Sequence, residues 1–102
     1  NVHETGFAGS LFALGILAAW GLVSHMLMQQ DMDAALVVAR ADIRYRAPVA
    51  SDIVCLCEIE KVIAEAFLGR VKIEGSGRLE TQVVIGERSE ALLTASLHAS
   101  RA

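Results

Sequence analysis

The sequence predicts an α+β domain in which an antiparallel sheet is curled around one long apolar helix. Three observations predict this fold class. Residues from Phe7 to Val23 are all apolar or small, and four later segments alternate apolar and polar residues with the period of strands. A short segment between the second and third of these has helical spacing instead. At 102 residues the chain fits one domain over residues 1–102.

The long apolar segment is expected to form a helix over residues 8–29. It carries no Asp, Glu, Lys or Arg, and a helix of about 22 residues is about 33 Å long, enough to cross a bilayer. Against a span, it holds several Gly and Ser residues and has no flanking Lys or Arg. A helix that is apolar all round can also be the centre of a soluble core. Since a membrane anchor would not require the four strands, we expect no membrane partner.

The four strand segments differ in how their faces are composed. In residues 36–47 the alternation predicts one apolar face and one charged face, made of Val37, Ala39, Ala41, Ile43, Tyr45 and Ala47 against Arg40, Asp42, Arg44 and Arg46. Residues 53–59 are apolar on most of both faces, which predicts a central strand. Residues 78–85 and 91–100 follow, joined by a turn at residues 86–89. Residues 60–72 are expected to form a short amphipathic helix.

Composition excludes several classes of protein. Apolar residues make up 54% of the chain and charged residues 21%, which excludes disorder. The net charge is −3 and the basic residues form no single run, so nucleic acid is not an expected partner. Two cysteines are too few for a disulfide framework and no charged segment precedes the apolar run, which predicts a cytoplasmic protein. The first residues look like the interior of a motif, so we expect a further strand before them.

Polar and small residues concentrate where the long helix begins, in residues 1–10. Helix amino termini leave backbone N–H groups unpaired and carry about half a positive charge, so they attract oxyanions and polarised carbonyl oxygens. The small residues Gly6, Ala8 and Gly9 would let a substrate approach closely. This stretch is the predicted chemical site of the chain.

The same stretch carries a family resemblance. The element from Thr5 to Leu11, followed by Trp20-Gly21-Leu22 and by residues 43–49, Ile-Arg-Tyr-Arg-Ala-Pro-Val, resembles hot-dog-fold thioesterases of the YiiD C-terminal domain family. The resemblance covers most of the chain. It implies hydrolysis of an acyl-CoA or acyl-carrier thioester in sites that two subunits complete, and therefore a homodimer or a dimer of dimers.

The resemblance also implies roles for individual residues. The thioester would be bound by Thr5, Gly6, Phe7, Ala8, Gly9 and Ser10, with backbone N–H groups near Phe7 and Ala8 polarising its carbonyl. Asn1 and His3 would orient substrate or water, while Ser10 could equally cap the helix. Many such enzymes place an Asp or Glu inside the central helix, and this helix has none. Of the carboxylates left, Glu4, Asp31 and Asp33, we favour Glu4 acting with His3.

Simpler interpretations stand beside these. Asn1, His3 and Glu4 could be a solvated terminus, and the charged face of residues 40–46 a solvated surface with cross-strand charge pairs rather than a contact for coenzyme A phosphates. Cys55 and Cys57 are expected to be core residues, with no metal site and no cofactor. A non-catalytic acyl-thioester binding module is the main alternative function. A hydratase and a membrane-anchored protein are less favoured.

Overall fold

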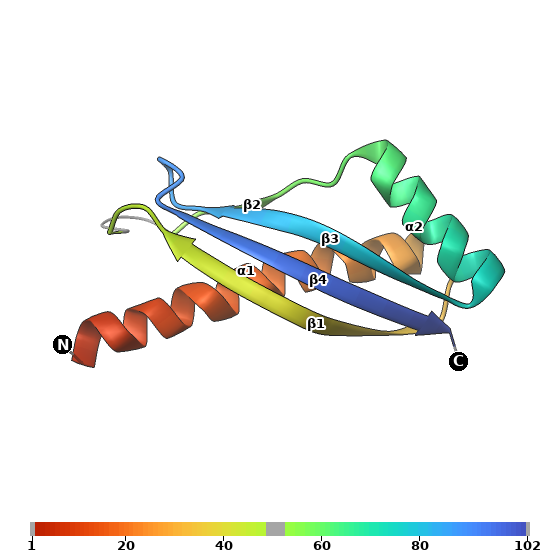
Figure 1. Ribbon diagram of the computed structural model, residues 1–102, viewed down its shortest axis with the longest axis horizontal. Coiled ribbons are helices and arrows are strands. Elements are labelled where there is room, and N and C mark those ends of the chain that lie inside the picture. Colours follow the sequence, from red (N-terminus) through yellow and green to blue (C-terminus); the bar gives the residue numbers. More distant parts are fainter. Residues whose placement is uncertain (1, 49–52, 102) are drawn as a thin grey trace.

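A computed structural model describes residues 2–48 and 53–101 of the chain, with side chains from Gly9 onward. The elements in chain order are α1 (Val2–Gln29), β1 (Ala34–Tyr45), β2 (Cys55–Cys57), α2 (Lys61–Glu74), β3 (Ser76–Ile85) and β4 (Ala91–Arg101). The long helix α1 lies along one face of a four-stranded antiparallel sheet, and the shorter α2 packs near one end of β3 (Figure 1). The predicted α+β class is confirmed.

The sheet has the order β1-β4-β3-β2, with every neighbouring pair antiparallel. β4 is therefore a central strand, and β1 and β2 are the edges. The expectation that residues 53–59 form a central strand is wrong, because only three of them pair with β3, at its last three residues. Apolar residues on both faces of residues 53–59 predict that both faces of this strand are buried. In the structure only the α1 side is covered, and Val54 and Leu56 remain exposed.

The core lies between α1 and the inner face of the sheet. α1 contributes one buried residue every four positions, namely Leu11, Gly15, Ala19, Val23 and Leu27. β4 contributes alternating Ala and Leu at Ala91, Leu93, Ala95, Leu97 and Ala99, all at most 1% exposed. A Cβ placed on Gly15 would lie 3.2 Å from Ile85 Cδ1 and 3.4 Å from Leu93 Cδ1. A glycine here lets the helix approach the sheet closely.

A β-bulge in β1 changes which residues face the core. The pairing with β4 shifts between Val38 and Arg40, so Ala39 has no residue opposite it. Before the bulge the inward residues are Leu36 and Val38, and after it they are Ala41 and Ile43. The expectation that Val37 and Ala39 share the apolar face with Ala41 is therefore wrong. A prediction from strict alternation cannot anticipate the one residue that a bulge inserts. Because of that residue, each β1 residue before the bulge lies on the opposite face from the one that the alternation after the bulge predicts.

The beginning of α1 also departs from expectation. The helix starts at Val2 rather than at residue 8, so its predicted start is wrong. Residues 2–7 include Gly6, but no proline interrupts this segment. Gly costs only about 1 kcal/mol in a helix interior, which a continuing helix can tolerate.

The second helix is held at its carboxyl end. It is 14 residues long, close to the predicted residues 60–72, and buries Phe67 and Val71. Gly75 caps it with a φ of 88°, and its N–H donates to the Val71 carbonyl at 3.1 Å. From β4, Arg101 Nη1 donates to the Lys72 carbonyl at 2.9 Å. The last strand thereby fastens α2 to the sheet.

One described helix is long and apolar enough to cross a membrane by length and composition, the Gly9–Gln29 part of α1. A core helix of a soluble protein passes the same test. Here one side of the helix packs against the sheet, while Leu14, Leu17 and Met28 on the opposite side are 40%, 62% and 70% exposed. The sheet contact accounts for one face of this helix and leaves the other uncovered.

Candidate functional site

The amino-terminal turns of α1 extend beyond the end of the sheet (Figure 1). Of the residues from Gly9 onward, Gly9 and Ser10 are exposed and Leu11 is the first that packs into the core. No neighbouring group lies within 4 Å of a Cβ built on Gly9. His3, Glu4 and Thr5 belong to the first turns of this protruding segment, and Asn1 lies outside the described residues. The predicted site is therefore at an open end of the molecule.

The longer helix moves the position of its free backbone donors. In an α-helix each N–H donates to the carbonyl four residues earlier, and only the first four N–H groups lack a partner. With the helix starting at Val2, the N–H groups of Phe7 and Ala8 lie opposite the carbonyls of His3 and Glu4. The expectation that the N–H groups of Phe7 and Ala8 polarise a substrate carbonyl is wrong for this geometry. Among the described residues, the free donors belong to residues 2–4.

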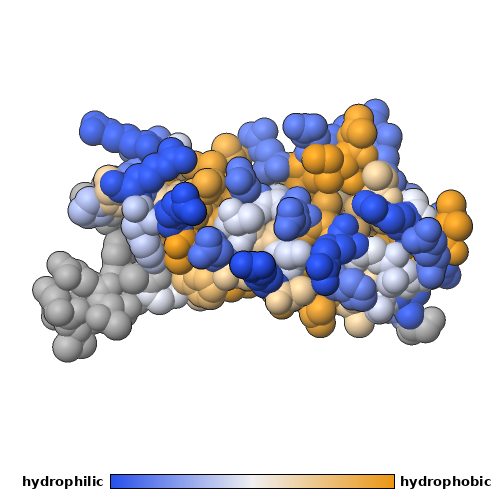
Figure 2. All heavy atoms as spheres, viewed as in Figure 1, coloured by the Kyte–Doolittle hydropathy of each residue, from blue (hydrophilic) through white to orange (hydrophobic). Residues whose placement is uncertain are grey.

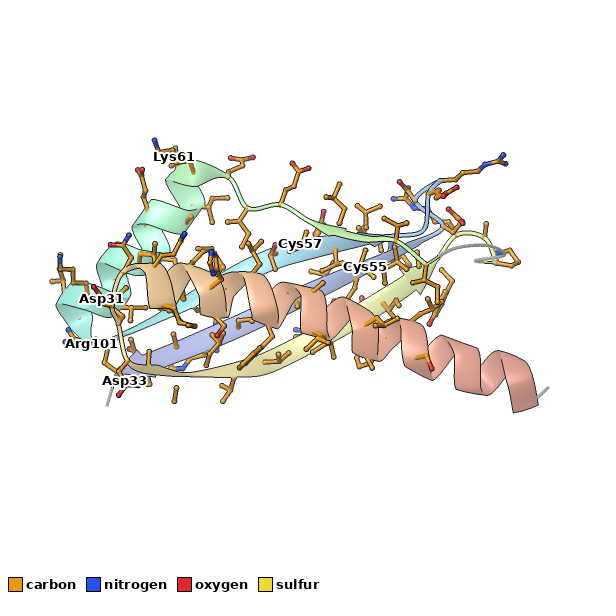
Figure 3. All side chains as sticks on the ribbon, turned by 180° about the vertical axis from the view of Figure 1, so that it is seen from behind. Asp31, Asp33, Cys55, Cys57, Lys61 and Arg101 are labelled. Atoms are coloured by element: carbon orange, nitrogen blue, oxygen red, sulfur yellow. The ribbon has the colours of Figure 1, made fainter. Side chains whose placement is uncertain are left out.

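The alternative carboxylates lie at the other end of the helix. Asp31 and Asp33 are both exposed and directly follow α1 (Figure 3). At 1.5 Å per residue, Asp31 is roughly 30 Å along the helix from Ser10. Neither side chain can act on a thioester held at the amino terminus of the same subunit. Glu4 is the carboxylate that remains at that end.

The two cysteines lie on the inner side of β2, where both are half-buried (Figure 3). Cys57 Sγ lies 3.4 Å from Thr81 Oγ1 in a hydrogen bond. Burial raises the pKa of the Cys55 thiol, which keeps it protonated and poorly nucleophilic at neutral pH. Among the described residues no three His, Cys, Asp or Glu side chains cluster in a way that could hold a metal ion. The thiols pack as core groups, as expected.

The charged side chains of β1 lie on the outer face of the sheet, away from α1. Figure 2 views this face, and hydrophilic residues spread across it. The predicted cross-strand charge pairs are absent, because the only ion pair among the described residues is Lys61 with Glu65, at 3.9 Å on α2. Two adjoining hollows of about 310 and 190 Å³ lie on this face, and both are lined by Asp42 and Thr94.

Sequence patterns missed the role of Trp20. Its indole Nε1 donates to the Leu36 carbonyl at 3.2 Å. An indole that is partly buried usually finds an acceptor for its N–H. The residue type thus predicts that the indole N–H has an acceptor, but only the fold shows that this acceptor is the Leu36 carbonyl. On the same helix His25 is exposed and Ser24 is half-buried.

Comparison with protein families gives one match over nearly the whole chain. The family model described as "Putative thioesterase (yiiD_Cterm)" matches residues 1–97. Its range includes the protruding start of α1, all of β1–β3 and most of β4. The match agrees with the resemblance found in the sequence motifs, and a thioesterase family implies a thioester substrate.

Three solved structures are similar to this one. A protein of unknown function from Chlorobaculum tepidum TLS has a TM-score of 0.87 at 18% identity, with 94% of this chain and 66% of that chain covered. A "putative thioesterase" from Shewanella oneidensis has a TM-score of 0.75 at 27% identity, covering 100% and 69%. A protein of unknown function from Pseudomonas aeruginosa, described as a probable thioesterase, has a TM-score of 0.59 at 14% identity, covering 68% and 48%.

These likenesses establish the hot-dog fold. The matched region amounts to 66%, 48% and 69% of the three solved chains, so each of those chains is longer than the part compared.

Proposed function

The chain belongs to the YiiD C-terminal thioesterase family, and on that premise we propose that it hydrolyses an acyl-CoA or acyl-carrier thioester at the amino terminus of α1. The observation that supports this site is the protruding start of a 28-residue helix whose first turns no strand covers. Such a helix end presents free N–H groups and the positive end of the helix dipole. Both stabilise the oxyanion that forms when water attacks a thioester carbonyl.

The proposed reaction needs only water and the thioester. The water oxygen attacks the carbonyl carbon, and the N–H groups of residues 2–4 hold the oxyanion. The C–S bond then breaks, giving the carboxylic acid and the free thiol. His3 and Glu4, on the first turn of the helix, are the groups proposed to accept the proton of the attacking water and to return it to the leaving sulfur. At Gly9, where a Cβ would have no neighbour within 4 Å, there is room for the acyl chain beside the helix.

A homodimer is part of the proposal. β1 is an edge strand of 12 residues, and such an edge readily pairs with another strand. On α1 the side opposite the sheet carries Leu14, Leu17, Gly21, Ser24 and Met28, at the alternating spacing of three and four that suits a second helix. A second copy would cover both surfaces and would close the site from the side that this chain leaves open.

The experiment is to measure free thiol release from a panel of acyl-CoA thioesters of increasing chain length. The proposal expects turnover above the blank, with a loss of about 100-fold or more in kcat for Glu4→Gln or His3→Ala, in the range typical of a general base. Glu87→Gln and His98→Ala make the same chemical changes on the β3–β4 turn and on β4, and should leave kcat unchanged. Absence of turnover with every substrate would refute the proposal.

The second candidate is a non-catalytic acyl-thioester binding module. The lack of any carboxylate in α1 from Thr5 to Gln29 favours it, because related enzymes commonly supply their catalytic carboxylate there. Calorimetry with a non-hydrolysable acyl-CoA thioether distinguishes the two. Binding of the thioether without hydrolysis of the matching thioester would establish the module and exclude the enzyme.

A further inference from the structure

The larger hollow on the outer face of the sheet is built from three adjacent strands. We call it the arginine hollow; its volume is about 310 Å³, and it is lined by Asp42, Arg44, Arg46, Gln82, Leu92 and Thr94. The strand register explains why these side chains meet. Thr94 of β4 pairs with Asp42 of β1 on one side and with Gln82 of β3 on the other, and Leu92 pairs with Arg44. All of these positions face away from α1.

The charges in the arginine hollow are unusual for this chain. The whole protein has a net charge of −3, whereas the hollow holds two guanidinium groups and one carboxylate. Within the described part of the chain, neither Arg44 nor Arg46 has an ion-pair partner. The neighbouring 190 Å³ hollow has the opposite balance, with Arg40 beside Asp42 and Glu80. Positive charge without a partner is therefore concentrated at the Arg44 and Arg46 end.

We propose that the arginine hollow binds the phosphate groups of a nucleotide-type ligand. Guanidinium groups two residues apart on one face can each donate two hydrogen bonds to phosphate oxygens. Gln82 and Thr94 add neutral donors, and the Asp42 carboxylate can accept from a sugar hydroxyl. Leu92 supplies an apolar floor at the half-buried base of the hollow. A volume near 300 Å³ lies at the lower end of small-molecule sites, which suits a phosphorylated sugar or nucleotide.

The position of the hollow connects it with the thioester site. Arg44 lies on the edge strand β1, and the end of β1 lies at the same end of the molecule as the amino-terminal half of α1 (Figure 1). Since β1 ends at Tyr45 and Arg46 lies just beyond it, a ligand held by Arg44 and Arg46 can pass around the end of β1, rather than along its edge, to the α1 side. This rests on the proposed function in one respect, the identity of the ligand as the phosphorylated ADP portion of coenzyme A.

Direct binding is tested by calorimetry with adenosine 3′,5′-bisphosphate, with adenosine as the probe that lacks phosphate. The full chain should bind the bisphosphate and not adenosine, and the affinity should weaken steeply as salt is added. The double variant Arg44→Gln with Arg46→Gln should lose at least 10-fold in affinity. Arg40→Gln on the neighbouring hollow and Arg70→Gln on α2 remove the same charge, and each should change the affinity less than 2-fold. Equal binding by the double variant, or no binding by the unmodified chain, would overturn the inference.

A kinetic arm separates this inference from the proposed function. In the double variant the KM for acyl-CoA should rise at least 10-fold at unchanged kcat, while the KM for the matching acyl-pantetheine, which lacks the nucleotide, stays the same. If the unmodified chain and the double variant hydrolyse both thioesters and have the same KM for acyl-CoA, the thioesterase proposal stands and the nucleotide site is refuted. Bisphosphate binding without hydrolysis of any thioester would support the nucleotide site and refute the proposed thioesterase activity. A KM rise for an acyl-carrier protein but not for acyl-CoA would assign the arginines to a protein partner and contradict the inference.

Discussion

The indole Nε1 of Trp20 and the backbone carbonyl of Leu36 are joined by a hydrogen bond of 3.2 Å. Trp20 belongs to α1 and Leu36 to β1, so the bond links the helix layer to the edge strand of the sheet. Every second peptide group of an edge strand lacks a partner strand. The indole therefore fixes the orientation of α1 over that edge, which is also the edge proposed to pair with a second copy.

Trp20→Phe should lower the free energy of unfolding by about 1 kcal/mol, because the ring remains and one hydrogen bond is lost. Trp20 is the only tryptophan, so unfolding should be followed by circular dichroism rather than by fluorescence. Phe12→Leu, which reduces an aromatic ring on the same helix without removing a hydrogen bond, serves as comparison. An unchanged midpoint for Trp20→Phe would mean that the bond contributes nothing to stability.

Gly15→Ala should destabilise the fold by about 1–3 kcal/mol, as overpacking of a core does. The added methyl would press on Ile85 and Leu93, at 3.2 and 3.4 Å from their Cδ1 atoms. Gly69→Ala is the matched control in the interior of α2, where a Cβ would have no neighbour within 4 Å. It should stabilise the protein by about 0.5–1 kcal/mol through helix propensity. Urea denaturation of both variants tests this, and the same sign for both would contradict the packing at Gly15.

Asp31→Gly should stabilise the end of α1 by roughly 0.5–1 kcal/mol. Asp31 has a φ of 53°, a left-handed conformation that glycine adopts freely, and the Met32 N–H beyond it closes the helix by donating to the Leu27 carbonyl at 3.1 Å. Asp33 has no such φ, so Asp33→Gly should give no gain. A thermal shift of the two variants compares them, and a lower midpoint for Asp31→Gly than for Asp33→Gly would contradict this account.

Leu17→Glu should convert the proposed dimer into a monomer that keeps its fold. Leu17 is 62% exposed in the single chain, so a charge is tolerated there until a second copy would bury it. Ile73→Glu introduces the same charge on α2 at a residue that is 85% exposed, and should leave the dimer unchanged. Light scattering at micromolar concentration measures both, and an unmodified chain that is itself monomeric would remove the dimer from the proposal.

Cys55 should react slowly with iodoacetamide at pH 8, because burial raises the pKa of its thiol above the ordinary value of 9.0. The native chain keeps this proton where the unfolded chain loses it, so the free energy of unfolding should fall as the pH rises above 9.0. The variant Cys57→Ser isolates Cys55 for the alkylation. Cys55→Ser should show a shallower loss of stability above that pH, and an identical slope would contradict the assignment.

The sequence by itself determined the class of fold, the position of α2 and three of the four strands, because helical and strand periods are local properties of the chain. It also identified the family from short motifs around Phe7 and Pro48. Only the tertiary structure decided that β2 is an edge, that Ala39 bulges out of β1 and turns Val37 outward, and that α1 begins at Val2. The first two of these features depend on which strand pairs with which and on what covers each face. Contacts between residues distant in the sequence determine such features, as the hydrogen bond between Trp20 and Leu36 illustrates.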